Sequence, residues 1–472
     1  MKKISAVTYI IVLGLMLRLV LIPNPGFEAD VAFWKSWGLA VRDFGIVKGL
    51  PLTNFNYPTP FAYVLSWMSI VYSFIADPHN YNEFWSNTNL LFLAISKAPS
   101  ILADFGIFAI ILWIGKSAKR INFPVFPAPF YLLLSSFYLL NPLALFDGAL
   151  WGQVDSLGVF LFLLANCMVL TKRPILAGVI YMVAMMTKLQ NMIYGPVFFL
   201  FIWQYLGFEG FIKAVGAAVG TFLAMNIEFI NARQMSRVIG DLTGNYDYFP
   251  WLSLNAYNVW WIVARARGME ISDKIAAIGI VNAKTVGLYM FSSTYLLSLL
   301  FMLRAKITDQ KTLIFRYLSA LIIVAAAFFL FQTESHDRYA FPISVFLLLW
   351  APFWIEKTQD SMKSFFILYS VFTILFFYNI HNALIANYPK NGIPFLTALN
   401  IPALTIAAAV AQIGLFGYFL FILRKHITPL LFAIWIGVFI LLITAGNAPL
   451  IFNKPVLITK ITPITSSTGY GT

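Results

Sequence analysis

Long apolar runs follow one another along this chain from residue 4 to residue 446. Hydrophobic residues make up 60% of the 472 residues and charged residues only 11%, whereas a soluble protein would carry about 25% charged residues. When lipid is the solvent, each segment must satisfy its own backbone polar groups, and an α-helix does so. The sequence therefore predicts an all-α polytopic membrane protein.

About thirteen apolar runs are candidates for membrane-spanning helices. They cover residues 4–22, 90–114, 126–145, 157–171, 174–190, 192–206, 213–230, 280–303, 311–331, 340–355, 363–380, 400–423 and 428–446. Several fall below the ~17–25 residues usual for a crossing. The first run follows Met1-Lys2-Lys3 and no Ala-x-Ala-like cleavage site comes after it. We expect an uncleaved first helix with a cytoplasmic N-terminus.

The basic residues indicate which loops face the cytoplasm. Those near the ends of the runs fall in loops that this count places inside: Lys116, Lys119, Arg120, Lys172, Arg173, Lys213, Arg304, Lys306, Lys311, Lys357, Lys363, Arg424 and Lys425. This distribution follows the positive-inside rule. Anionic lipid headgroups account for the net charge of +13 better than nucleic acid does. The expected location is a plasma (inner) membrane.

The same count places two long loops outside, residues 23–89 and 231–279. If the short apolar stretch 61–75 were a span, every later loop would invert, so we expect it to lie along the outer interface as an amphipathic helix. The second loop carries five cations that oppose the positive-inside rule: Arg233, Arg237, Arg265, Arg267 and Lys274. Either the number of spans before this loop is wrong by one, or these cations face an anionic group. We favour the second explanation.

Two carboxylates, Glu28 and Asp30, lie near the start of the first outer loop. Asp30 directly precedes a stretch in which apolar residues such as Trp34 and Trp37 recur at helical spacing. It could cap that helix, a role worth ~1 kcal/mol. It could also act as a general base that removes a proton from an acceptor hydroxyl at the membrane surface. Glu28 is the competing carboxylate.

A polar turn joins two of the predicted spans near residue 150. It contains Trp151, Gln153 and Asp155, and Asp147 lies shortly before it. Asp155 could simply cap the next helix. A plain connection between two apolar helices needs none of these groups, however, and an aromatic face beside hydroxyl-binding amides and carboxylates suits a sugar.

Cations recur at two other predicted outer turns. Lys188 and Gln190 end a span on the side where lysine is disfavoured, and snorkelling of the lysine is the alternative to ligand binding. His336, Asp337 and Arg338 join two spans with no spare length. The planar fork of Arg338 could clamp a phosphate, or it could pair with Asp337 and do nothing chemical.

Several motifs are missing from the sequence. It contains no Walker A or Gly-rich nucleotide loop, no closely spaced Cys/His metal set and no Gly-x-Ser-x-Gly elbow. A nucleotide-sugar enzyme or an ATP-driven pump is therefore unsupported, and an activated donor at the outer face would have to arrive on a lipid. Cys167 is the single cysteine, so an intrachain disulfide is excluded.

Taken together, these motifs resemble the GT-C superfamily of integral membrane glycosyltransferases. The resemblance rests on Asp30 with Trp34 and Trp37, Tyr57-Pro58, Trp151-Gly152-Gln153-x-Asp155, Lys188-x-Gln190, Ser253 to Trp260 and His336 to Pro342. It is closest to prokaryotic polyprenyl-phosphate-dependent hexosyl- or mannosyltransferases. It covers residues 1–342, whereas the helices and short outer tail of residues 343–472 are generic.

The resemblance implies a GT-C-like catalytic module over residues 1–342, with interfacial helices in its first outer loop. Asp30 matches the position of the catalytic carboxylate; Glu28 stays an alternative, because the eukaryotic relatives have an Asp that is missing between Gly26 and Phe27. The residues implied at the donor phosphate are Arg338, His336 and Lys188. Those implied at the sugar or acceptor are Trp151, Gln153, Asp155, Gln190, Tyr57 and Asn258.

The reaction implied is transfer of a hexose, such as mannose or glucose, by a single inverting displacement. The acceptor would be a lipid-linked glycan, a protein or an envelope polymer, and no cofactor is required. A divalent metal stays open, because Glu28, Asp30 and Asp155 could bind one. Two alternatives come from other classes: a lipid-linked glycan flippase or secondary transporter, and a non-catalytic subunit of an envelope glycan assembly complex.

Overall fold

The structure is a computed structural model that describes residues 5–304, 309–356 and 361–449. The predictions made for Lys2, Lys3, Lys306, Lys357 and the C-terminal tail fall outside these residues. Across the described ranges the chain is helical apart from loops and one two-stranded antiparallel sheet, β1 (Ala276–Ile278) with β2 (Val281–Asn282). The predicted all-α class is confirmed.

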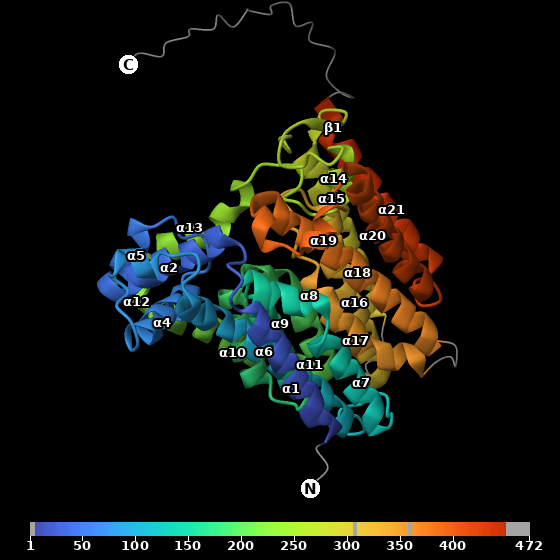
Figure 1. Ribbon diagram of the computed structural model, residues 1–472. Coiled ribbons are helices and arrows are strands. Elements are labelled where there is room, and N and C mark those ends of the chain that lie inside the picture. Colours follow the sequence, from blue (N-terminus) through green and yellow to red (C-terminus); the bar gives the residue numbers. More distant parts are fainter. Residues whose placement is uncertain (1–4, 305–308, 357–360, 450–472) are drawn as a thin grey trace, which may run out of the picture.

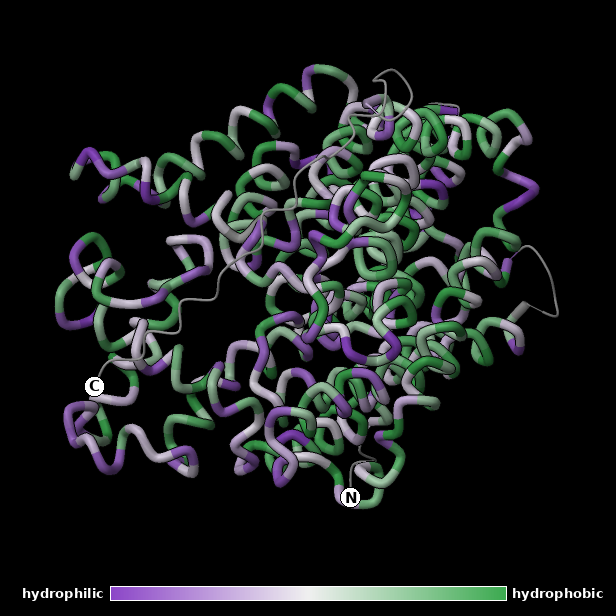
Figure 2. The backbone as a smooth tube through the Cα atoms, turned by 90° about the horizontal axis from the view of Figure 1, so that it is seen from above, coloured by the Kyte–Doolittle hydropathy of each residue, from purple (hydrophilic) through white to green (hydrophobic). Residues whose placement is uncertain are grey.

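Eight helical stretches of the described residues are long and apolar enough to cross a membrane. They are Leu90–Ser117, Ala128–Trp151, Leu189–Met225, Ala283–Leu303, Gln310–Phe331, Met362–Asn387, Pro402–Leu423 and Pro429–Gly446. Figure 2 shows hydrophobic residues along these helices and hydrophilic residues mainly in the segments that connect them. The protein is therefore a multi-pass membrane protein.

Besides α4 (Phe61–Ser73), four apolar helices of the described residues are shorter: α1 (Ala6–Leu21), α9 (Asp155–Leu170), α10 (Pro174–Thr187) and α17 (Phe341–Ile355), with 14 to 16 residues each. At about 1.5 Å per residue they reach only about 21–24 Å, less than a hydrocarbon core of about 30 Å. The total of about thirteen crossings therefore stays a prediction.

The remaining elements complete the chain order shown in Figure 1. They are α2 (Glu28–Phe44), α3 (Ile46–Gly49), η1 (Leu50–Leu52), α4 (Phe61–Ser73), α5 (Tyr81–Phe84), α6 (Leu90–Ser117), α7 (Ala128–Leu139), α8 (Pro142–Ala144), η2 (Leu145–Trp151), η3 (Leu189–Tyr194), α11 (Gly195–Met225), α12 (Ile227–Asn231), α13 (Met235–Thr243), η4 (Gly244–Asp247), α14 (Val259–Val263), α15 (Ala283–Leu303), α16 (Gln310–Phe331), α18 (Ser361–Asn387), η5 (Pro389–Asn391), α19 (Pro394–Thr397), α20 (Pro402–Leu423) and α21 (Pro429–Gly446).

The two spans predicted at residues 192–206 and 213–230 form one helical stretch, α11, with a break at Gly207. Gly207 has φ 76° and ψ 179°, a conformation that a residue without Cβ adopts readily. α11 therefore consists of two helical segments on either side of Gly207, as the two predicted runs require, and the prediction that each of them crosses the membrane stays a prediction. The chain changes direction at a single glycine.

The first predicted outer loop folds into a helical subdomain on one flank of the bundle, coloured blue in Figure 1. Trp34 and Trp37 of α2 pack with Phe61 and Leu65 of α4, and the same core includes Phe229 of α12, just before the second loop, and Val238 of α13, within that loop. The helical spacing predicted for α2 is confirmed. The placement of α4 along the membrane interface stays a prediction.

A buried ion pair joins α1 to α6 inside the bundle. Arg18 Nη2 lies 2.8 Å from Asp104 Oδ2, and both side chains are fully buried. Tyr138 donates a hydrogen bond of 2.7 Å to Asp104 Oδ1, and Arg18 also donates to the carbonyl oxygens of Gly14 and Leu139. Both charges are thus balanced and hydrogen-bonded, as burial requires.

Breaking this pair should destabilise the protein strongly. We expect Arg18→Met to lower the free energy of unfolding by roughly 3–5 kcal/mol, because it leaves the Asp104 carboxylate buried without a cation. The double variant Arg18→Met/Asp104→Asn should recover part of the loss. Thermal unfolding in detergent measures both, and an unchanged midpoint for Arg18→Met would rule out a stabilising role.

Candidate functional site

Asp30 lies in the first turn of α2, which begins two residues before it at Glu28. The N-cap is Phe27, and no side chain caps this helix, so Asp30 does not have the capping role. Its Oδ2 accepts hydrogen bonds from Trp151 Nε1, at 3.1 Å, and from Gln153 Nε2. The structure therefore brings together the carboxylate and the polar turn that the sequence singled out separately.

Glu28 is held by a different set of partners. Its Oε1 accepts a hydrogen bond of 3.0 Å from Asn391 Nδ2, and its Oε2 accepts one of 2.5 Å from Asn87 Nδ2. Asn391 also donates to the carbonyl oxygen of Gly26 at 2.8 Å. Glu28 thus ties the first loop to η5. These contacts favour Asp30 over Glu28 as the carboxylate of the site.

Local backbone geometry fixes the turn that faces Asp30. Residues Leu145–Trp151 form a π-helix, a rare arrangement that is frequent at functional sites. It ends at Gly152, whose φ of 93° suits glycine. Gly26 packs so closely on this turn that a Cβ there would lie 2.2 Å from the carbonyl oxygen of Trp151. The stacked rings of Phe27 and Trp151 complete the contact.

Lys188 supplies the first cation of the site. Its Nζ lies 3.1 Å from Asp155 Oδ1 and 3.4 Å from Gln153 Oε1. The residue is buried, which excludes snorkelling, and Asp155 pairs with it rather than capping α9. Burial acts to lower the pKa of Lys188, but the charges of Asp155, Tyr57 and Asp147 together raise it more, so the pKa lies above its ordinary value and the ammonium stays charged.

Arg338 supplies the second cation, from the turn between α16 and α17. Its Nη1 lies 3.5 Å from Asp337 Oδ1, and its Nε lies 3.8 Å from Asp155 Oδ2. Both distances exceed those of a good hydrogen bond. Among the described residues, Arg338 Nε, Asp155 Oδ2 and Asp337 Oδ2 have no hydrogen-bond partner. The guanidinium of Arg338 therefore keeps N–H groups that do not bond to Asp337, and these groups can bind an anion.

His336 lies in the same turn. Its backbone bridges to Leu254 and Asn255 of the second loop, and its ring packs against Tyr339. Burial, together with the nearby charges of Arg338 and Lys188, holds the pKa of His336 well below its usual range. The imidazole is therefore neutral at pH 7. The positive charge of the site comes from the lysine and the arginine.

The other predicted residues divide into two groups. The ring of Tyr57 lies 6.0 Å from Lys188 Nζ, and Gln190 Nε2 donates a 2.8 Å hydrogen bond to the carbonyl oxygen of Tyr339, so both adjoin the cluster. Asn258 is fully buried, caps α14 and donates to the carbonyl oxygen of Phe329. It joins the second loop to α16 instead of contacting the cluster.

Sequence reasoning missed two residues of α6 that hold the site together. Lys97 Nζ donates to the carbonyl oxygens of Ile22 and Asn24, at 2.9 and 2.6 Å, and Ser100 donates to the carbonyl oxygen of Gln153 at 2.5 Å. Both side chains are fully buried. A lysine inside a long apolar helix is the signal that could have found them.

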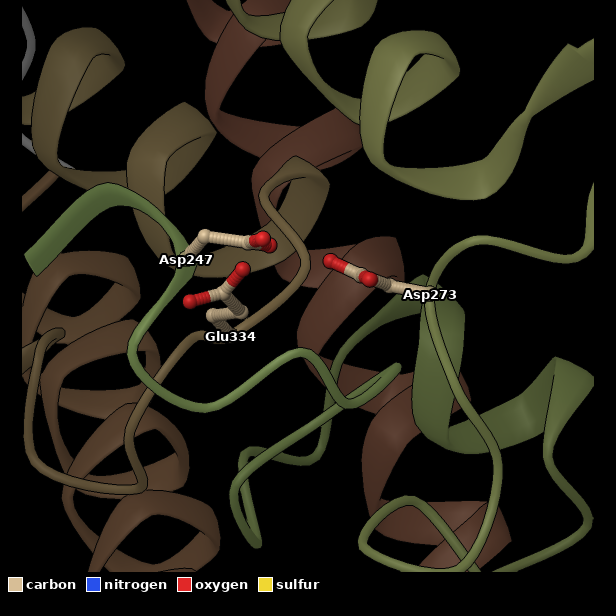
Figure 3. Close-up of side chains that lie close together, drawn as sticks. All are labelled: Asp247, Asp273 and Glu334. Atoms are coloured by element: carbon tan, nitrogen blue, oxygen red, sulfur yellow. The ribbon is translucent and has the colours of Figure 1, made fainter.

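A separate group of carboxylates joins the second loop to the 333–339 turn. Oxygen atoms of Asp247, Asp273 and Glu334 lie within 4.8 Å of one another, and Figure 3 shows the three carboxyl groups pointing together. Lys284 Nζ lies 2.8 Å from Asp247 and 2.5 Å from Glu334, and Lys274 Nζ lies 2.9 Å from Asp247. Cations of the chain itself therefore balance this group, which is not the set proposed from the sequence.

Carboxylates of the same loop account for some of the five cations of the second loop. Arg237 pairs with Asp241 at 3.0 Å, and Arg267 lies 4.0 Å from Glu270. Lys274 pairs with Asp247, whose pKa falls to about 2 through hydrogen bonds from Lys284 and Lys274. Three of the five therefore face carboxylates of the chain.

Glu334 should make stability depend on pH. Burial raises its pKa to about 7 from 4.5 despite the hydrogen bond from Lys284, so the folded state holds this proton more tightly than the unfolded state. The stabilisation is full below about pH 4.5 and is lost as the pH rises through about 7. In Glu334→Gln the loss of stability between pH 5 and pH 8 should be smaller, as thermal unfolding would show. Glu270→Gln, at an exposed position, is the control; equal pH dependence in wild type and Glu334→Gln would contradict the assignment.

No protein-family model and no curated protein matches this chain.

Proposed function

We propose that this protein is a GT-C-type glycosyltransferase that moves a hexose from a polyprenyl-phosphate donor to an acceptor hydroxyl at the outer face of the membrane. One observation carries the proposal. A carboxylate, Asp30, is connected through Gln153 to a buried cation, Lys188, and a second cation, Arg338, faces the same Asp155 as Lys188 does. The candidate base, Asp30, therefore lies next to two cations, Lys188 and Arg338, that can bind an anion.

Asp30 would act as the general base. Both hydrogen bonds from the polar turn go to Oδ2, which leaves Oδ1 for the acceptor hydroxyl. Asp30 is only partly buried, so a substrate can approach it. Positioned bases of this kind typically contribute about 10²–10⁴-fold to the rate.

The two cations would bind the phosphate and stabilise its departure. As Asp30 takes the hydroxyl proton, the acceptor oxygen forms a bond to the anomeric carbon, and the bond from that carbon to the phosphate oxygen breaks. The electron pair leaves with the polyprenyl phosphate. Lys188 and Arg338 would balance the charge where it develops. A single displacement of this kind inverts the anomeric configuration.

A small apolar cavity of about 50 Å³ lies between α16, α17, α18 and α20. It is lined by aliphatic and phenylalanine side chains with one amide, Gln412, and it includes Ala340, two residues after Arg338. The cavity is too small to enclose a polyprenyl chain. The chain of the proposed donor would lie in the lipid against the outside of the bundle, while its phosphate contacts the Arg338 guanidinium.

The proposal is tested with purified protein in liposomes. We expect radiolabel to move from polyprenyl-phospho-mannose or polyprenyl-phospho-glucose to an added acceptor, with release of polyprenyl phosphate. Translocation of an intact lipid-linked glycan across the liposome membrane, with no label transferred, would favour the flippase alternative. Mass spectrometry of polyprenol-linked glycans from cells with and without the gene would identify the sugar.

A further inference from the structure

A cavity of about 320 Å³ opens between the second loop and the C-terminal helices. Its lining residues are Asn255, Trp261, Ala266, Arg267, Gly268, Met269, Glu270, Ala386, Asn400, Pro402 and Thr405. It is much larger than the cavities of about 20 and 50 Å³ within the helix bundle. Its volume reaches the range of roughly 300–1,000 Å³ that is usual for small-molecule sites.

The side chains of this cavity suit a ligand rich in hydroxyl groups. Trp261 forms an aromatic wall, and its indole Nε1 is held by a 3.1 Å hydrogen bond to Thr405 Oγ1. Arg267 and Glu270 stand at the rim with 61% and 66% of their side chains exposed, and their closest charged atoms are 4.0 Å apart. At that distance the two side chains make no direct hydrogen bond, so each can bond to a ligand. Their charges cancel, so the cavity favours a neutral ligand.

The backbone around the cavity supplies an independent observation. Asn255, Arg265 and Ala266 have φ values of 60°, 50° and 65°, in the left-handed region that alanine and arginine rarely adopt. Asn255 and Ala266 line the cavity. Such strained residues persist where the surrounding structure enforces them, and they gather at ligand-binding sites.

Two of the residues that line the cavity, Asn255 and Ala386, belong to segments that contact segments of the candidate active site. The backbone of Asn255 bridges to His336, two residues before Arg338. Ala386 precedes Tyr388 by two residues, and the Tyr388 hydroxyl accepts a 3.0 Å hydrogen bond from the backbone N–H of Ala29, next to Asp30. Backbone contacts therefore connect the cavity to the segment that carries the base and to the turn that carries Arg338.

We propose that this cavity binds the acceptor, and that the acceptor is a neutral sugar unit of a glycan. This inference rests on the proposed glycosyltransferase function. The sugar hydroxyls bond to Arg267, Glu270 and the amide of Asn400, the apolar face of the sugar lies near Trp261, and the reacting hydroxyl extends toward Asp30.

The test measures transfer to octyl mannoside and octyl glucoside, whose hexose hydroxyls serve as acceptor probes. Arg267→Ala and Glu270→Ala should each raise the KM for these probes by roughly tenfold, as expected for losing a hydrogen bond to a charged group. Asn400→Trp, which fills the cavity, should raise it further. The KM for the donor should not change. Arg233→Ala removes an exposed arginine of the same loop that does not line the cavity, and it should leave both constants unchanged.

Donor-only hydrolysis separates the two ways in which the test can fail. If the wild-type protein neither hydrolyses nor transfers from the polyprenyl-phospho-hexose, the proposed function is wrong. If it transfers to the probes but the three cavity variants keep the wild-type acceptor KM, only the acceptor site is overturned. Transfer to an octanoylated serine peptide but not to the octyl glycosides would overturn the glycan as acceptor.

Discussion

Replacing Asp30 by Asn should lower the turnover number for hexose transfer by roughly 10²–10⁴-fold. Asparagine has nearly the same shape, and its amide oxygen can still accept the hydrogen bonds that Trp151 and Gln153 donate to Asp30. It cannot take up the proton of the acceptor hydroxyl. Donor affinity should therefore stay close to that of the wild type. Initial rates at saturating donor and acceptor, together with equilibrium binding of labelled donor, measure both quantities.

Glu28→Gln is the matched control for this variant. Glu28 lies two residues from Asp30, but the amides of Asn391 and Asn87 hold it away from the polar turn. We expect a much smaller loss of turnover than for Asp30→Asn. The reverse order of effects would assign the base to Glu28, and transfer by Asp30→Asn at the wild-type rate would exclude Asp30 as the base.

Replacing Arg338 by Ala should weaken donor binding by roughly 10²-fold, because a guanidinium can make two charge-assisted hydrogen bonds to one phosphate. Arg338→Lys keeps the charge but loses the planar fork, so its donor affinity should lie between those of the wild type and the alanine variant. Titration of each purified variant with labelled polyprenyl-phospho-hexose measures the dissociation constants.

The Arg338 variants need a control for folding, because Asp155 and Asp337 both face this guanidinium. Removing it leaves Asp337 without its nearest cation, and thermal unfolding would report the resulting loss of stability. Lys188, 3.1 Å from Asp155, still balances that carboxylate. Unchanged donor affinity in a folded Arg338→Ala protein would remove the phosphate-binding role.

The sequence predicts the local part of the site well. Helical spacing of Trp34 and Trp37 predicts α2, because buried aromatic residues on one face report directly on helix periodicity. The position of Lys188 at the end of an apolar run, where lysine is disfavoured, draws attention to this residue, but its pairing with Asp155 comes from the structure alone. Neither signal depends on distant parts of the chain.

Long-range pairing could not be predicted in the same way. Asp30 and Trp151 are separated by 121 positions, and periodicity carries no information about which helices pack together. Hydropathy predicts separate apolar runs at 192–206 and 213–230, but it does not show that a single residue, Gly207, separates the two helical segments. Asn258 belonged to a motif of the resemblance, but its amide bonds the backbone of α16, a role that its residue type does not reveal.

The side of the membrane that the site faces is decisive for the proposed function, and cysteine labelling of intact cells tests it directly. Cys167 is buried and is the single cysteine, so Cys167→Ala gives a background for introduced cysteines. We expect a membrane-impermeant maleimide to label Tyr81→Cys and Arg267→Cys, at exposed positions, in intact cells. Lys119→Cys and Lys172→Cys should react only after permeabilisation. Labelling of Lys119→Cys or Lys172→Cys in intact cells, with Tyr81→Cys and Arg267→Cys protected, would place the site in the cytosol and contradict the proposal.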